Sequence, residues 1–305
     1  MNKLMLLLFC LTIQRTLDAK GLESHYFEVA YGKRALSIKV YMEQGISEKK
    51  PLIIYSHGLG GSNETKKYLL EYWAEAGFIC VSVQHPGSDE MVWKNVVGSK
   101  KLKAMKDAAS TKQFLIRNKD IPAVLNQLEK WNISKTHKLF DRIDFTKVAM
   151  SGHSFGAVTA QAMMGAEYHR SINFKEKRIM AFLLMSPSPV SGKNQSKALD
   201  QITSPVLCMT GTKDTSMIKP SVGYKERASL YHALPKGYKY LYIFDGGKHN
   251  LFSGPNIFNK KLKEEHIVIQ KLSLLFWQAH LLNNAKAQKE LDNFKAREND
   301  NWKKK

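Results

Sequence analysis

The apolar residues of the chain fall into short runs that are separated by longer helix-compatible segments. Two early runs, 25–31 and 35–42, alternate between apolar and polar positions across a Gly-Lys-Arg turn, which predicts an antiparallel β-hairpin. Six later runs are apolar on both faces, which is typical of strands in a parallel sheet covered by helices. These buried-strand candidates are 51–56, 78–83, 147–151, 179–185, 205–210 and 239–244.

Helical periodicity fits the segments between and after these strands. The candidate helices are 64–76, 120–131, 157–164, 223–233 and 263–283. A hairpin followed by alternating strands and helices favours one doubly wound α/β domain, with a mostly parallel sheet of about eight strands and helices on both faces. We place this domain at 20–283, with a cap-like insertion at about 87–142. The charged tail at 284–305 is expected to be a fraying helix or disordered.

The composition allows a globular enzyme without identifying one. Apolar residues make up 43% of the 305 and charged residues 24%, which excludes a disordered chain, a collagen-like fibre and a multi-span membrane protein. Three cysteines are too few for a disulfide scaffold. Cys80 and Cys208 lie inside apolar runs on strands that we do not expect to be neighbours, so both are predicted to be buried free thiols.

The first nineteen residues have the pattern of a signal peptide. Lys3 precedes an apolar run at 4–13, which is too short to cross a bilayer as a helix but suits a signal-peptide core. Ala19 offers a cleavage point before Lys20; the alternative is a buried N-terminal strand or helix. We predict export to the periplasm or the extracellular space, and a mature chain without a stable membrane span.

The pentapeptide Gly-His-Ser-Phe-Gly at 152–156 carries the strongest chemical signal. A G-x-S-x-G motif alone is only suggestive, but here an apolar strand precedes it and a helical segment follows it. A nucleophile elbow requires that setting, because a tight strand-to-helix turn exposes the serine oxygen. Ser154 is therefore the predicted nucleophile. The alternative is a glycine-rich turn with an incidental serine.

A serine hydroxyl needs a base to take its proton, and the base needs an acid to orient it. His249 follows the strand 239–244 and precedes the last helix, so we expect it at the carboxyl end of the sheet, where such folds place their sites. Asp214 follows the strand 205–210. The chain order Ser154, Asp214, His249 puts each residue after a different strand, as a Ser-Asp-His triad on a parallel sheet requires.

Other polar residues at strand ends leave alternatives open. Asp245 ends a strand only four residues before His249, and Asp200 lies in a linker without a preceding strand, so both rank below Asp214 as the acid. His85 closes the strand 78–83. It is a candidate for lining the site rather than for the general base.

A glycine-rich loop, Ser-His-Gly-Leu-Gly-Gly at 56–61, directly follows the strand 51–56. Glycines let backbone N–H groups approach a substrate closely, and we predict that the N–H groups of Leu59 and Phe155 stabilise the oxyanion. The alternative is a phosphate loop, but no Gly-Lys-Ser/Thr follows. Because no Cys/His cluster has metal-ligand spacing, the sequence indicates no metal site.

Together these motifs resemble the α/β hydrolases, and among them the group labelled predicted dienelactone hydrolases, which is related to platelet-activating-factor acetylhydrolases of the plasma type. The resemblance covers about 26–276. It rests on 56–62, 84–88, Arg117 with Asp120, 152–157, 211–214 and 247–249. It implies the α/β-hydrolase fold and serine-dependent hydrolysis of esters, without metal or organic cofactor.

Two features depart from these relatives. True dienelactone hydrolases use a cysteine nucleophile, whereas the elbow here holds Ser154. Plasma-type acetylhydrolases carry their acid after the strand that follows the elbow strand, and here that place, 185–189, contains no carboxylate. Asp214, one strand later, is the predicted acid, so the resemblance does not extend to a phospholipid substrate.

Positive charge is concentrated near the expected site. The chain has a net charge of +20, and 94–119 holds eight basic residues and one acidic residue. A basic rim would attract anionic substrates such as lipid headgroups or acidic polysaccharide esters; the alternative is a solvated lysine-rich surface. No nucleic-acid-binding motif accompanies the charge, so nucleic acid is not an expected partner.

We therefore expect a carboxylic ester hydrolase that forms an acyl-enzyme and acts on small-molecule or lipid-like esters with short acyl groups. A serine peptidase and a catalytically silent binding protein on the same fold are the alternatives. The chain lacks room for the large extra domain of prolyl-oligopeptidase-like enzymes. All three triad positions are filled, which disfavours a silent protein.

Overall fold

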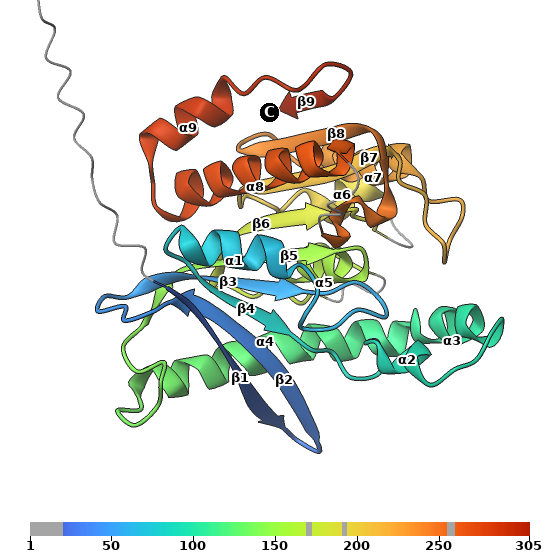
Figure 1. The fold of residues 1–305 in the computed structure, drawn as a ribbon. Helices are drawn as coiled ribbons and strands as arrows, with labels where there is room; N and C mark the ends of the chain where they lie inside the picture. The colour runs from blue at the N-terminus through green and yellow to red at the C-terminus, as the bar shows by residue number, and fades with distance from the viewer. Residues whose placement is uncertain (1–20, 169–172, 191–193, 255–259) are drawn as a thin grey trace, which may run out of the picture.

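A nine-stranded sheet runs through the part of the chain that the structure, a computed structural model, describes: residues 21–168, 173–190, 194–254 and 260–305. The expected signal peptide at 1–19 lies outside these residues. The strand order is β1-β2-β4-β3-β5-β6-β7-β8-β9 (Figure 1). The strands are β1 (Leu22–Tyr31), β2 (Arg34–Glu43), β3 (Lys50–Ser56), β4 (Ile79–Val83), β5 (Ile143–His153), β6 (Ile179–Met185), β7 (Val206–Lys213), β8 (Lys239–Lys248) and β9 (Asn301–Lys304).

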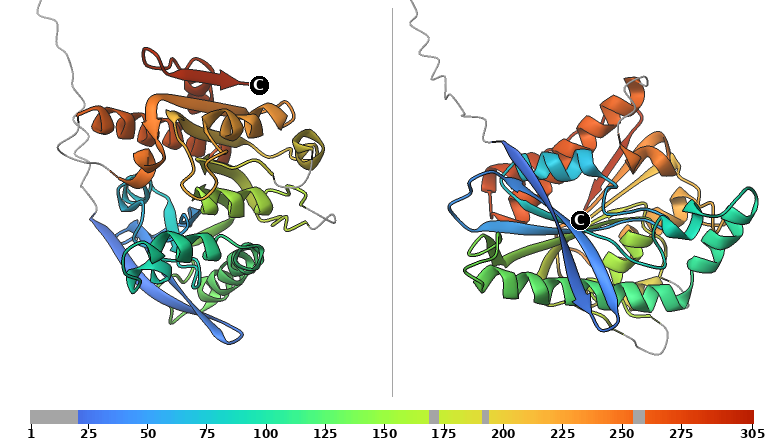
Figure 2. Two further views of the ribbon diagram at one scale, coloured as in Figure 1. Left: turned by 90° about the vertical axis from the view of Figure 1, so that its right-hand side faces the viewer. Right: turned by 60° about the horizontal axis from the view of Figure 1, so that its bottom comes forward.

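The sheet is parallel in its centre and antiparallel at both ends. Strands β4, β3, β5, β6, β7 and β8 pair in parallel. The hairpin β1–β2 joins β4 in antiparallel pairing at one end, and β9 joins β8 at the other. Figure 2 shows the hairpin and the C-terminal strand at opposite ends of the sheet. Because all six parallel strands end at the same edge, the residues that follow them can meet there.

Helices cover both faces of the sheet, as the doubly apolar strands require (Figure 2). One face packs against α1, α8 and α9, and the other against α4, α5, α6 and α7. The helices are α1 (Lys67–Glu75), α2 (Met91–Lys94), α3 (Lys100–Ala108), α4 (Thr111–Ile133), α5 (Phe155–Met163), α6 (Gln195–Leu199), α7 (Tyr224–Ala233), α8 (Lys260–Leu281) and α9 (Ala285–Asp292), with a 3₁₀ turn η2 at His249–Ser253. The chain has the α/β-hydrolase fold predicted from the sequence, with nine strands where about eight were expected, because β9 was not predicted.

Helix α4 begins nine residues before the predicted start at residue 120. The side chain of Ser110 caps it by accepting a hydrogen bond from the Gln113 N–H, and the helix continues through Pro122. A proline inside a helix removes one backbone hydrogen bond, which is why the sequence pattern predicts a helix start near it. As a result Arg117, which precedes the predicted helix, lies within α4, and Asp120, the first residue of the predicted helix, lies in its interior.

The expected cap-like insertion at 87–142 contains three helices with different surroundings. Helix α4 packs on the sheet through Ile121, Val124, Leu125 and Leu128, so it belongs to a covering layer. Helices α2 and α3 project beyond the sheet next to the N-terminal half of α4 (Figure 1).

The tail is ordered, contrary to the expectation of a fraying helix or disorder. Its helix α9 buries Ala287 and Leu291 against the sheet layer, and β9 pairs with β8. The Trp302 ring stacks on Tyr240 with ring centroids 5.5 Å apart. Aromatic packing and strand pairing therefore fix a segment whose mixed charge gives no periodic signal.

Both described cysteines are free and buried, as predicted. Cys80 lies on β4 and Cys208 on β7, which are not adjacent in the sheet.

Candidate active site

The turn between β5 and α5 has the strained geometry of a nucleophile elbow. Ser154 adopts φ 54° and ψ −114°, a conformation that non-glycine residues adopt only when their surroundings enforce it. A Cβ atom on Gly152 would lie 2.2 Å from the Gly156 carbonyl oxygen, and one on Gly156 would lie 1.9 Å from the Ser56 carbonyl oxygen. Only glycine fits at either position, and the turn leaves Ser154 partly exposed to solvent.

The structure brings the three predicted triad residues into hydrogen-bonding distance. Nε2 of His249 lies 3.1 Å from Oγ of Ser154, and its Nδ1 lies 2.7 Å from Oδ1 of Asp214. They follow β5, β7 and β8, so the parallel strands deliver them to one edge of the sheet. The Asp214 side chain is fully buried and that of His249 is 27% exposed, which leaves the serine and imidazole reachable from solvent.

Several donors converge on the Asp214 carboxylate. The hydroxyls of Ser186 and Thr210 donate to its Oδ2 at 2.6 and 2.9 Å. Burial opposes ionisation of this carboxyl, but the hydrogen bond from His249 and the nearby charge of Arg227 outweigh it and hold the pKa of Asp214 below its ordinary value. Asp214 is thus kept ionised, as a residue that orients and stabilises an imidazolium needs to be.

Arg227 on α7 is a site residue that the sequence did not reveal. Its side chain is 1% exposed, and Nε lies 3.0 Å from Oδ1 of Asp214. Its Nη1 donates to the carbonyl oxygens of Ser186 and Pro187 at 2.8 and 3.1 Å. The guanidinium thus ties the acid to the loop after β6. An arginine that follows Lys225 and Glu226 on a mostly polar helix gives no sequence signal of burial.

Ser186 occupies the place after β6 where the plasma-type relatives carry their acid. It adopts φ 51°, and its hydroxyl points at Asp214. Ser186 therefore donates a hydrogen bond to the carboxylate of Asp214, which follows the next strand, β7.

His153, immediately before the serine, supports the predicted base. Its ring lies 4.9 Å from that of His249, and its Nε2 is 3.3 Å from the His249 carbonyl oxygen. Burial, with the positive side chains nearby, holds the pKa of His153 well below its ordinary value. The neutral ring can therefore donate to that carbonyl and hold the start of η2.

The residues considered as alternatives for the acid, and His85, lie outside the hydrogen-bonded chain of Ser154, His249 and Asp214. Asp245 is exposed and accepts a hydrogen bond from the Thr212 hydroxyl. Asp200 is exposed at the end of α6. His85 is fully buried and bonds to Ser56 and Asp120 rather than to the triad.

The glycine-rich loop after β3 lies directly against the predicted nucleophile. A Cβ on Gly58 would lie 3.2 Å from Nδ1 of His153 and 3.5 Å from Cβ of Ser154. Phe155 is the first residue of α5, so its N–H has no carbonyl partner within the helix. Neither the Leu59 nor the Phe155 N–H donates to a carbonyl in the turns and loops of the described residues. Their assignment as oxyanion donors stays a prediction.

Helices α2 and α3 contact the same loop from outside. The indole N–H of Trp93 donates to the Gly60 carbonyl at 2.7 Å, and a Cβ on Gly60 would lie 2.7 Å from the terminal methyl of Met105. Of the eight basic residues in 94–119, Arg117 is buried and the seven lysines are exposed. The lysine-rich surface therefore lies next to the loop that carries Leu59.

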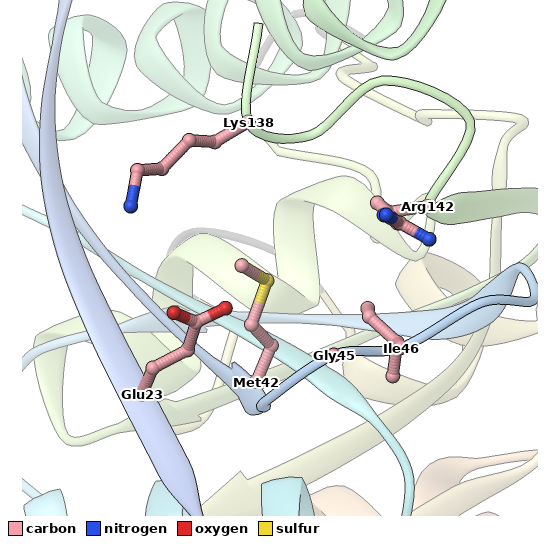
Figure 3. Close-up of a pocket in the computed structure, with 6 residues that line it drawn as sticks. All are labelled: Glu23, Met42, Gly45, Ile46, Lys138 and Arg142. Atoms are coloured by element: carbon pink, nitrogen blue, oxygen red, sulfur yellow. The ribbon is translucent and has the colours of Figure 1, made fainter.

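A separate surface cavity of about 220 Å³ lies away from this edge (Figure 3). Glu23, Met42, Ile46, Lys138 and Arg142 line it, with Gly45. Arg142 directly precedes β5, so the cavity lies at the opposite ends of the strands from Ser154. It does not belong to the candidate active site.

Metal-binding geometry is not found in the described residues. No group of three or more His, Cys, Asp or Glu side chains among them is arranged to hold an ion. Within the same residues, no helix is long and apolar enough to cross a membrane.

The fold, the strained serine turn and the glycine-rich loop define the class: the chain is an α/β hydrolase. A family profile described as platelet-activating factor acetylhydrolase, isoform II, matches residues 9–213, about two thirds of the chain. The chain belongs to this family, which indicates a serine-dependent hydrolase that acts on esters. The match includes Leu59 and Ser154 and ends immediately before Asp214. No curated protein sequence matches the chain.

Proposed function

We propose that the protein hydrolyses carboxylic esters through an acyl-enzyme formed on Ser154. The observation that carries this proposal is the continuous hydrogen-bonded path from Ser154 Oγ through both nitrogens of His249 to Asp214. A serine in a strained turn, with a base and a buried ionised acid behind it, is an arrangement for nucleophilic catalysis.

In the proposed mechanism each group has one role. Ser154 attacks the ester carbonyl while Nε2 of His249 takes its proton, and Asp214 stabilises the imidazolium that forms. The N–H groups of Leu59 and Phe155 bind the oxyanion of the tetrahedral intermediate. His249 then protonates the leaving alcohol. Water, activated by the same histidine, releases the acid and restores the serine.

For the substrate we propose small, lipid-like esters with short acyl groups. The support is the family, whose name denotes an acetylhydrolase. The exposed lysines of 94–119 extend this proposal to anionic esters, because several of them belong to α2 and α3, whose Trp93 and Met105 contact the loop after β3. Rates with acetyl, butyryl and decanoyl esters of one alcohol test the acyl preference; a faster decanoyl ester would contradict it.

We also propose that residues 1–19 are a signal peptide and that the mature protein is periplasmic or secreted. The support is the sequence pattern alone. N-terminal sequencing of protein recovered outside the cytoplasm tests it, and a mature chain that keeps Met1 would refute it.

Replacing the nucleophile tests the reaction itself. Ser154→Ala should reduce ester hydrolysis to the background rate while circular dichroism stays unchanged, because it removes the hydroxyl on which the acyl-enzyme is proposed to form. Ser196→Ala, at an exposed position on α6, is the matched control and should retain full activity. A panel of nitrophenyl esters and peptide anilides separates an esterase from a peptidase. Absence of both activities would favour a silent binding protein.

A further inference from the structure

The guanidinium of Arg117 lies in the interior directly behind the glycine-rich loop. It is fully buried and contacts three segments that are far apart in sequence. Its Nη2 donates to the Ser56 hydroxyl at 2.9 Å and to the carbonyl oxygen of His57. Its Nη1 donates to the Ser88 hydroxyl at 3.0 Å, in the loop after β4, and its Nε donates to the Thr159 hydroxyl at 3.1 Å, on α5.

The same guanidinium packs on the aromatic ring of Phe155. Its central carbon lies 4.7 Å from the ring centroid, a distance at which a cation and an aromatic face attract each other. One side chain therefore holds both the loop that carries the Leu59 N–H and the first turn of the helix that carries the Phe155 N–H.

These two segments also touch through their backbones. A Cβ on Gly156 would lie 1.9 Å from the Ser56 carbonyl oxygen and 2.8 Å from that of His57. Arg117 bridges this same junction through the His57 carbonyl and the Thr159 hydroxyl. A small movement of its guanidinium would therefore change the distance between the loop after β3 and helix α5.

The four hydrogen-bond acceptors of Arg117 are neutral oxygens. Burial lowers the pKa of Arg117 to about 9, although the charge of Asp120 raises it, so the guanidinium stays protonated at neutral pH. Burying a charge among neutral groups is costly unless its hydrogen bonds are well satisfied. The planar fork can satisfy several acceptors in fixed directions, which no other side chain can do.

A second buried chain of contacts holds Ser56 from the other side. Its hydroxyl lies 3.0 Å from Nε2 of His85, whose Nδ1 lies 2.9 Å from Oδ2 of Asp120, and Asp120 pairs with Arg34. This Ser-His-Asp sequence has the connectivity of a triad, but all three residues are fully buried. It thus anchors the start of the loop and offers no surface to a substrate.

We propose that Arg117 is a positioning residue for the oxyanion hole, fixing the Leu59 N–H relative to the Phe155 N–H. The proposal rests on the proposed function, because it names what holds that site's two donors. Oxyanion donors act when they lie about 2.7–3.1 Å from the developing charge, and misplacement of a catalytic group by about 1 Å can cost about 10²-fold in rate. Loss of the guanidinium should therefore lower kcat and leave KM nearly unchanged.

The test compares Arg117→Gln and Arg117→Lys with Thr159→Val and Ser88→Ala, which each remove one contact. Arg178→Gln is the matched control, since Arg178 pairs with Glu176 and Glu129 away from the site. Active sites are titrated with a fluorophosphonate, so that kcat for p-nitrophenyl acetate is measured per functional site. For Arg117→Gln we expect kcat to fall about 10–10²-fold with KM changed less than about threefold. A trifluoromethyl ketone, which forms a tetrahedral oxyanion on the serine, should lose affinity by the same factor as kcat/KM.

A merely structural role would lower the melting temperature and the titratable fraction but leave kcat per site unchanged, and that result overturns the proposal. Should Arg117→Gln fail to fold, Thr159→Val and Ser88→Ala decide, because unchanged kcat per site in both would also overturn it. Wild-type protein that neither hydrolyses esters nor reacts with the fluorophosphonate would refute the proposed function, and the positioning role with it. An active wild type whose Arg117, Thr159 and Ser88 variants keep their kcat per site would refute the positioning role alone, so the two failures can be told apart.

Discussion

Replacing Asp214 with asparagine removes the charge beside the imidazole of His249 and keeps the shape of the side chain. The carboxylate accepts from His249 at 2.7 Å and lies 3.0 Å from the Arg227 guanidinium. Asparagine keeps one acceptor oxygen but places an N–H₂ donor at the other position. It can therefore hold His249 in the wrong tautomer, and it cannot stabilise the imidazolium.

The expected loss follows from the geometry. With Nδ1 and Oδ1 2.7 Å apart, the centres of the two charges are about 4 Å apart. At an effective dielectric constant of about 20, their attraction is about 4 kcal/mol, and about 1.4 kcal/mol corresponds to a tenfold change in rate. Loss of the charge alone thus lowers kcat about 10³-fold, and the tautomer effect brings the total toward about 10⁴-fold.

The substitution also removes the counter-ion of a buried arginine. Arg227 is 1% exposed, and breaking a buried pair by removing one partner costs about 3–5 kcal/mol of folding free energy. The assay therefore measures kcat for p-nitrophenyl acetate below the melting temperature of the variant. Rates are divided by the concentration of sites that react with a fluorophosphonate.

Asp245→Asn is the matched control, since Asp245 is an exposed carboxylate four residues before His249. It should retain wild-type kcat. If Asp245→Asn or Asp200→Asn causes the large loss and Asp214→Asn does not, the assignment of the acid is wrong. A loss below about tenfold in Asp214→Asn would show that the charge of Asp214 contributes little to stabilising the imidazolium.

Two other outcomes depend on charge. Because the pKa of Asp214 is lower in the folded protein than its ordinary value of 3.8, the ionised group stabilises the fold above that value, and this contribution disappears as the pH falls through the lower, folded value. Urea unfolding at a series of pH values checks this, and a wild type and Asp214→Asn with the same acid dependence would contradict it. Anionic esters should exceed matched neutral esters in kcat/KM at low salt and lose that advantage at high salt, because ions screen the lysines of 94–119. Equal salt dependence for the two ester classes would show that these lysines do not steer the substrate.

Local patterns were sufficient to predict the strands and the three residues that the structure brings together. Doubly apolar runs predict buried parallel strands, and Ser154, Asp214 and His249 each directly follow one. Since parallel strands end at one edge, residues 95 positions apart in sequence, such as Ser154 and His249, can be placed near each other without knowledge of any contact.

Contacts between distant segments could not be predicted in this way. Arg227 looks like a surface residue of a mostly polar helix, and its burial depends on Asp214 and the loop after β6. Arg117 was expected before a helix. Because prolines are rare inside helices, Pro122 makes the first half of α4 hard to recognise from the sequence. Strand β9 is defined by its pairing with β8 and by the stacking of Trp302, neither of which is visible as periodicity.

The most direct test of nucleophilic catalysis by Ser154 is to locate the covalent intermediate. The protein is mixed with p-nitrophenyl acetate, quenched in acid during the first turnover, digested and examined by mass spectrometry. We predict one acetyl group on the peptide that contains Ser154, and none on that peptide in Ser154→Ala. Acetylation of another residue during turnover, or turnover of the ester by Ser154→Ala at the wild-type rate, would contradict the account.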